Sequence, residues 1–138
     1  MKKLMTYLLT AVVVVGIIFG ALSFIVAGQL ANEDAAVALA TEVSTDWSGR
    51  AASVHPEYMR KVSKPDAIAS FGRAKFLGKL VDTRDVGQVK EWDYSQRFMI
   101  VFTGIFEHGT ADVEVSIFKR GDNRELLDMK VTNIKIKQ

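Results

Sequence analysis

The chain has 138 residues, a formal net charge of +2 and no cysteine. The absence of cysteine excludes disulfides, thiolate metal sites and cysteine nucleophiles. Lys2 and Lys3 account for the excess charge, so the rest of the chain is formally neutral, which excludes a strongly basic domain of the kind that binds nucleic acid.

A long apolar segment opens the chain. Residues 4–32 carry no charged side chain, and the apolar part runs from Leu4 to Ala27. About 20 apolar residues in a helix cross the roughly 30 Å hydrocarbon core of a bilayer. We therefore expect a transmembrane anchor at residues 1–31, with the lipid bilayer as its partner. The predicted anchor residues include Leu4, Tyr7, Val15, Ile18 and Phe24.

A cleaved secretory signal is the alternative interpretation of this segment. Signals have a basic start, which is present, but their apolar stretch spans only about 7–15 residues and ends at a small-residue cleavage site. The stretch here is longer, and the most suitable cleavage site is Val26-Ala27-Gly28. These features favour an uncleaved anchor.

The charges flanking the segment predict its orientation. Lys2 and Lys3 precede it, whereas Glu33 and Asp34 follow it and the next basic residue is Arg50. Positive charge stays in the cytoplasm. We expect a single-pass protein of the cytoplasmic (inner) membrane, with its N-terminus in the cytoplasm and residues 32–138 in the periplasm or outside the cell.

Apolar residues at helix spacing follow the anchor, and they predict a helix over residues 33–48. Asn32 is the predicted N-cap and Gly49 the predicted end. The alternative is a helix that runs unbroken from the membrane, since no proline precedes Pro56. The predicted buried face comprises Ala36, Leu39, Ala40, Val43 and Trp47.

The next segment is less regular. Residues 50–62 suit either a loop or a short helix over residues 51–54, which His55-Pro56 would break. A second helix is predicted to begin with Ser63 as N-cap and Pro65 in its first turn, and to stop at Gly78.

Four strands are predicted after Gly78, at residues 80–91, 95–107, 110–119 and 125–136. His108-Gly109 and Gly121-Asp122-Asn123 are the predicted turns. A change of apolar phase in the last strand predicts a bulge near Thr132-Asn133. The fold class is therefore α+β: a transmembrane helix, then helices packed on a four-stranded antiparallel meander within one domain, residues 32–138.

The strand pattern also predicts what is buried. Residues 111, 113, 115 and 117 are apolar and alternate with polar ones, as in a half-buried strand. Residues 98–102 are apolar on both faces, so we expect helices or a partner to cover the second face.

This order of elements resembles the nuclear-transport-factor-two-like superfamily, which has the cystatin-like cone fold. The resemblance spans residues 33–136 and rests on Leu39–Trp47, Phe76–Val81 and the strand–turn–strand stretch Val101–Ala111. The family's usual glycine-lysine-tryptophan before the last strand is replaced by residues 123–126. The superfamily contains enzymes, binding modules and secretion-machine components, so the resemblance implies a fold and no single activity.

The order of elements also resembles type IV pilins, in which an apolar N-terminal helix continues into an amphipathic half and an antiparallel sheet follows. The chain lacks the pilin glycine processing site and the glutamate at the fifth mature position. A pilin-like filament subunit is retained as an alternative.

The sequence presents no catalytic or metal-binding motif. His55 and His108 have no spacing that would bring them together, and we expect both to be exposed turn residues. Asp112 and Glu114 are expected to pair with Arg97 or Lys130 across strands. We therefore predict no catalytic residue, no metal ligand and no cofactor, and the sequence identifies no small-molecule ligand.

Three aromatic residues are the predicted interaction candidates: Trp92, Tyr94 and Phe118. Trp92-Asp93-Tyr94 lies between two strands and fits either a binding edge or a core tryptophan beside a turn. Phe118 falls on the polar face of its strand. The expected function is a non-enzymatic interaction or accessory subunit that binds another membrane protein. The alternative is a small-ligand-binding or enzymatic cone domain.

Overall fold

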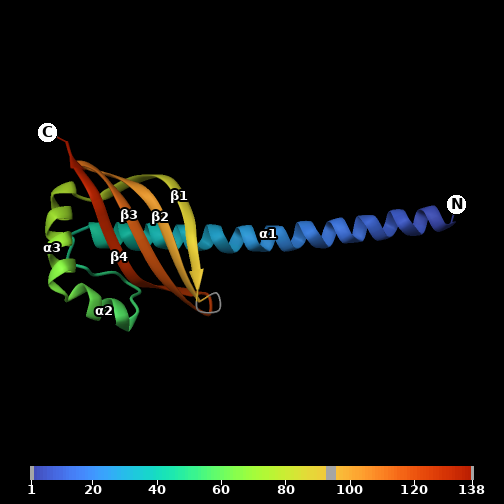
Figure 1. Cartoon of the computed structure of the whole chain (residues 1–138), viewed down its shortest axis with the longest axis horizontal. Helices are drawn as coiled ribbons and strands as arrows, with labels where there is room; N and C mark the ends of the chain where they lie inside the picture. The colour runs from blue at the N-terminus through green and yellow to red at the C-terminus, as the bar shows by residue number, and fades with distance from the viewer. Residues whose placement is uncertain (1, 93–95, 138) are drawn as a thin grey trace. The chain divides into compact units, whose positions relative to one another are not determined.

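The structure is a computed structural model that describes residues 2–92 and 96–137 (Figure 1). The chain divides into two compact units, residues 1–31 and 32–138. The helices are α1 (Lys2–Ser44), α2 (Pro56–Val62), α3 (Pro65–Ala74) and the 3₁₀ turn η1 (Lys75–Leu77). The strands are β1 (Leu80–Trp92), β2 (Arg97–Phe106), β3 (Gly109–Arg120) and β4 (Asn123–Ile136). The predicted α+β class is confirmed.

The helix α1 begins in the first unit and ends in the second, so the unbroken helix is the correct alternative. The N-cap predicted at Asn32 is wrong, because this residue lies inside the helix and is buried. The end predicted at Gly49 is also wrong: α1 ends at Ser44, and Trp47 follows it with a left-handed φ of 53°.

Residues 51–54 are not helical, and the proline begins a helix instead of interrupting one. Pro56 occupies the first turn of α2, where its missing N–H costs no hydrogen bond. His55 is the N-cap, and its Nδ1 accepts a hydrogen bond from the Glu57 amide at 3.1 Å. Val54 forms a parallel bridge with Leu126 of β4.

The predicted second helix is present as α3 and η1. Its N-cap is Lys64, one residue after the predicted Ser63, and Lys64 makes no side-chain capping bond. Pro65 occupies the first turn as expected. Gly78 follows η1 with a φ of 79°, a left-handed conformation that favours glycine.

The four strands form one antiparallel sheet in the order β1-β2-β3-β4, as the meander prediction requires. The β2–β3 turn consists of Glu107-His108, one residue before the predicted pair, and Gly109 already belongs to β3. The β3–β4 turn consists of Gly121-Asp122.

The predicted bulge in β4 is confirmed by the pairing. Thr110 pairs with Lys135 and Asp112 with Thr132, so β4 has one more residue than β3 between these pairs. Asn133 there has a φ of 52°. A second irregularity, between Ser116 and Ile117 of β3, was not predicted.

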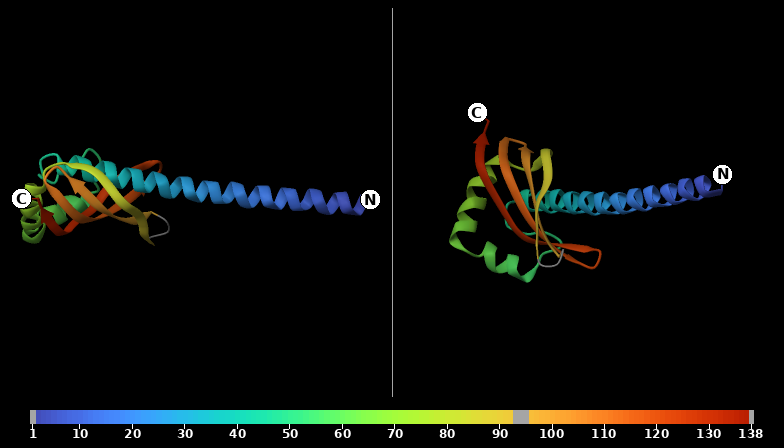
Figure 2. Two further views of the ribbon diagram at one scale, coloured as in Figure 1. Left: turned by 90° about the horizontal axis from the view of Figure 1, so that it is seen from above. Right: turned by 45° about the vertical axis from the view of Figure 1, so that its right-hand side comes forward.

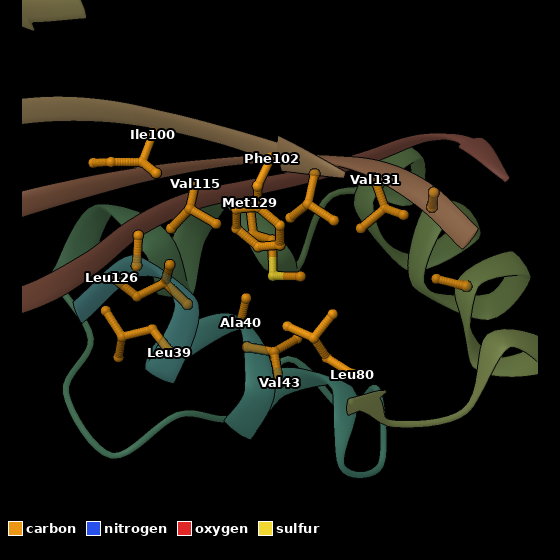
Figure 3. Packing of buried hydrophobic residues seen from close by; sticks show 14 of the residues in the cluster. Leu39, Ala40, Val43, Leu80, Ile100, Phe102, Val115, Leu126, Met129 and Val131 are labelled. Atoms are coloured by element: carbon orange, nitrogen blue, oxygen red, sulfur yellow. The ribbon is translucent and has the colours of Figure 1, made fainter. Parts of the chain in front are cut away.

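The hydrophobic core lies between residues 32–44 of α1, the short helices and one face of the sheet. Figure 3 shows Leu39, Ala40 and Val43 facing Phe102 and Met129 of the sheet. The alternation predicted in β3 is confirmed, since residues 111, 113, 115 and 117 are all buried. The face predicted for residues 36–47 is confirmed too, with Trp47 6% exposed.

The other face of the sheet is only partly covered. In β2, Phe98, Ile100 and Phe102 are buried, whereas Met99 and Val101 between them are half-buried. The helices α2 and α3 lie beside β4 in Figures 1 and 2. The helices therefore do not fully cover the second apolar face of β2.

Candidate functional site

The apolar segment forms part of one continuous helix. α1 is the one described helix that is long and apolar enough to cross a membrane, and the side chains of its apolar part are exposed. A signal sequence near an N-terminus meets the same criterion. The five predicted anchor residues are all exposed: Leu4, Tyr7, Val15, Ile18 and Phe24.

The first aromatic candidate lies at the end of an edge strand. Trp92 is the last residue of β1 and is half-buried, so it is neither a core tryptophan nor a fully exposed one. The Lys90 ammonium lies 5.2 Å from the centre of its ring, within the range of a cation–π contact. Tyr94 lies outside the described residues.

Phe118 is half-buried beneath polar side chains. The His55 ring lies 4.9 Å from its centre, and the guanidinium groups of Arg97 and Arg120 lie at 5.8 and 5.4 Å. The expectation that His55 is an exposed turn residue is therefore wrong: it is half-buried, caps α2 and packs on Phe118. Phe118 is less available to a partner than its place on a polar face suggested.

Ion pairs hold the side chains around Phe118. Arg97 donates two hydrogen bonds to the Glu57 carboxylate, at 3.0 and 3.3 Å, and Arg120 donates one to Glu125 at 3.2 Å. The Arg97 guanidinium holds the pKa of Glu57 below its ordinary value of 4.5. Because both partners are about a quarter exposed, the pair orients α2 on the sheet more than it stabilises the fold.

Among the described residues, neither acid of β3, Asp112 or Glu114, forms the ion pair that was predicted for it. Arg97 bonds Glu57, and Asp112 accepts a hydrogen bond from the Asn133 amide at 3.3 Å. Glu114 lies opposite Lys130 in the β3–β4 register, but no ion pair joins them among the described residues. His108 is exposed in the β2–β3 turn. No group of three histidine or carboxylate side chains that could hold a metal occurs within residues 2–92 and 96–137.

Buried polar groups serve the packing of the domain. Asn32 donates to Gln88 Oε1 at 3.0 Å and accepts from Arg124 Nε at 2.6 Å. The Ser44 hydroxyl accepts from the Leu80 amide at 2.9 Å. These bonds connect α1 to β1 and β4, and they satisfy groups that would be costly to bury alone.

The Tyr58 hydroxyl is an exception among the buried polar groups. It is buried and has no hydrogen-bond partner among the described residues. Burial, aided by the nearby Asp128 carboxylate, raises the pKa of this phenol. Asp128 itself pairs with Lys61 of α2 at 3.8 Å, so the edge of β4 carries charge beside the buried phenol.

A groove follows the line where α3 meets β4, and sequence reasoning did not identify it. It consists of two adjoining hollows of about 550 and 540 Å³ that share Arg73, Val131 and Thr132. We call this the α3–β4 groove. Its other lining residues are Lys61, Lys64, Asp66, Ala67, Ser70, Phe76, Asp128, Met129, Lys130, Asn133, Ile134 and Ile136. The available signal was Phe76, an apolar residue of η1 that is 73% exposed.

Comparison with known proteins adds no relative: no family model, no curated protein and no solved structure matches this chain.

Proposed function

We propose that this chain is a single-pass membrane protein whose domain, residues 32–138, lies outside the cytoplasm and binds another membrane protein as a non-enzymatic accessory subunit. The observation that carries the proposal is the uncharged apolar part of α1. Its residues are exposed, and exposed apolar surface of this extent is unfavourable in water. A bilayer removes that cost.

The packing of the domain supports an interaction module over a cone-shaped active site. Apolar side chains fill the space between α1 and the sheet, as Figure 3 shows. The buried polar groups among the described residues are Asn32, Ser44, Ser116 and the Tyr58 hydroxyl. Of these only the Tyr58 phenol is an acid, and burial raises its pKa, which keeps it protonated and makes it a poor general base. The groove and the partly covered sheet face lie at the surface, where a protein partner can reach them.

The proposal includes membership of the cone-fold superfamily that the sequence resembles. Helices that precede a four-stranded meander, and a core between those helices and one sheet face, support it. Since that superfamily contains enzymes as well as structural subunits, the fold leaves the activity to be argued from the site.

Membrane extraction of the full-length protein tests the anchor. Wild-type protein should stay in the membrane pellet after alkaline washing and retain its original N-terminus on sequencing. Val15→Arg with Ile18→Arg should release it, because each arginine near the centre of a span costs about 3 kcal/mol. Val81→Arg with Val89→Arg is the matched control, since both valines are exposed on β1 in the domain. A mature soluble chain that begins near Gln29 would contradict the proposal.

Affinity purification from detergent-solubilised membranes tests the accessory role. We expect a second membrane protein to co-elute in a fixed ratio, and we expect His108→Ala to leave that ratio unchanged because His108 is exposed in a turn. Elution of the chain alone, at monomer mass and after mild cross-linking, would refute an accessory subunit. Loss of function in His108→Ala with the partner retained would favour the enzymatic alternative.

A further inference from the structure

We propose that the α3–β4 groove is the docking site for an extended, acidic segment of a partner protein that carries a bulky apolar side chain. This inference rests on the proposed function and specifies the surface and the chemistry through which the domain would bind. It follows from the shape of the groove, its charge and its apolar end.

The shape results from small side chains on α3. Ala67 and Ser70 lie three residues apart, and so on one side of the helix, where they line the groove. Their short side chains leave the space between the helix and β4 unfilled. Met129 and Val131, both buried, line the groove from the strand side. Each hollow has a volume within the range of ligand pockets, about 300–1,000 Å³, which is large enough for a bulky side chain of a partner.

The charge of the groove favours an acidic occupant. Four cations line it, Lys61, Lys64, Arg73 and Lys130, against the two carboxylates Asp66 and Asp128. Lys61 is paired with Asp128. No ion pair is described for the other three cations within the part of the chain that the structure covers. The domain is formally neutral overall, so this local excess of positive charge is a feature of the groove.

The far end of the groove is apolar. Phe76 and Ile136, which are 73% and 44% exposed, line the second hollow together with Ile134. Aromatic residues are enriched at the cores of protein interfaces, and Phe76 is the aromatic residue that lines this groove. A leucine or phenylalanine side chain of the partner would bury Phe76 and Ile136. Carboxylates on either side of it in the partner segment would then face the cations of the groove.

The edge of the sheet suits an extended segment. β4 is an edge strand, and in the described residues its outer edge is hydrogen-bonded by another segment only at Leu126, through Ser53 and His55. Beyond Leu126 the strand continues along the groove to Ile136. Edge strands with unpaired backbone groups are common binding sites for extended peptides.

A selection experiment tests both the place and the chemistry. The full-length protein, reconstituted in lipid nanodiscs, is used to select binders from a displayed library of random twelve-residue peptides. We expect the enriched peptides to be acidic and to contain a large apolar residue. Fluorescence anisotropy with the best peptide should show at least tenfold weaker binding to the Lys64→Glu, Arg73→Glu double variant and a similar loss for Phe76→Ser.

The control is Lys79→Glu with Arg84→Glu, which makes the same charge change at exposed residues outside the groove. It should bind the peptide as the wild type does. Both double variants should keep the wild-type circular dichroism spectrum, since all four substituted residues are exposed. If Arg73→Glu is misfolded, Lys64→Glu with Phe76→Ser replaces it.

Three results would overturn the inference: no enrichment of any peptide, enrichment of basic or uncharged peptides, or equal loss of binding in the control. Groove-dependent self-association in sedimentation would assign the groove to a second copy of this chain instead. Alkaline extraction reports the anchor and peptide binding reports the groove, so the proposed function and this inference can fail separately.

Discussion

Replacement of Trp47 by alanine is expected to destabilise the domain by about 3–5 kcal/mol. The side chain is 6% exposed and packs on the rings of Phe71 and Phe106, with centroids 5.9 and 5.8 Å away. A buried aromatic side chain removes about 150–250 Å² from water, which corresponds to about 4–6 kcal/mol at 25 cal/mol per Å². The methyl group of alanine retains a small part of this burial.

The substitution also removes a hydrogen bond. Trp47 Nε1 donates to the Gly78 carbonyl at 2.9 Å, and loss of this donor costs about 1 kcal/mol. Trp47→Phe separates the two effects, because it keeps most of the ring and loses the donor. We expect it to cost about 1–2 kcal/mol.

Chemical unfolding of the fragment 32–138, followed by far-ultraviolet circular dichroism, measures these free energies. This readout does not depend on tryptophan emission, which the substitution changes. Trp92→Ala is the matched control: Trp92 is half-buried at a strand end and should cost clearly less. A loss below about 1 kcal/mol for Trp47→Ala would show that the packing around α1 is not as the structure describes.

Three further predictions concern stability. Gly109→Ala should cost about 1–3 kcal/mol, because a Cβ there meets a backbone oxygen of β4, whereas Gly72→Ala, which has open space on α3, should gain about 0.5–1 kcal/mol in the same unfolding assay. His55→Ala should cost about 1 kcal/mol through loss of the α2 cap, and an unchanged unfolding midpoint would refute the cap. The pKa of Glu57 is lower in the folded state, so its ion pair stabilises the fold above pH 4.5 and is lost as the pH falls further. Glu57→Gln should therefore lose less stability than the wild type between pH 6 and about pH 3, and parallel pH profiles would contradict this.

The spacing of apolar residues predicted those parts of the fold in which one face of a strand or helix is buried. The alternation in β3 placed four apolar side chains on the buried face because strand side chains point to opposite sides in turn. The change of phase near Thr132-Asn133 predicted the bulge for the same reason. Glycine and proline marked the boundaries of α3 and the β-turns to within about one residue.

Pairs of neighbouring buried residues were beyond this reasoning. Leu126 and Leu127 are both buried, which strict alternation does not allow. An irregularity opposite Ser116 and Ile117 explains it, since a bulge lets consecutive residues turn the same way. The cause lies in the pairing with β3, and the local sequence of β4 carries no sign of it.

The candidate site was predicted even less completely. The sequence drew attention to three aromatic residues: Trp92 and Tyr94, which lie between two predicted strands, and Phe118, which falls on the polar face of its strand. The groove instead combines small residues of α3 with the far half of β4, segments separated by about 60 residues in the chain. Neither segment is unusual by itself, so only the fold shows that Ala67 and Ser70 leave room beside Val131.

Asn32 shows most clearly how distant partners override a local signal, and it leads to a prediction. Asparagine before two acids is typical of an N-cap, yet α1 continues through it. Its partners, Gln88 and Arg124, lie 56 and 92 residues away in the chain. Asn32→Leu should cost about 1–3 kcal/mol, because both half-buried partners lose their bonds to the buried Asn32 side chain. Asn32→Asp should cost less, since a carboxylate keeps a charge-assisted bond to Arg124. If the two hydrogen bonds set the cost, Asn32→Leu combined with Arg124→Met should destabilise the domain by less than the sum of the single changes. Additive losses in denaturant unfolding would show that Asn32 is retained for another reason.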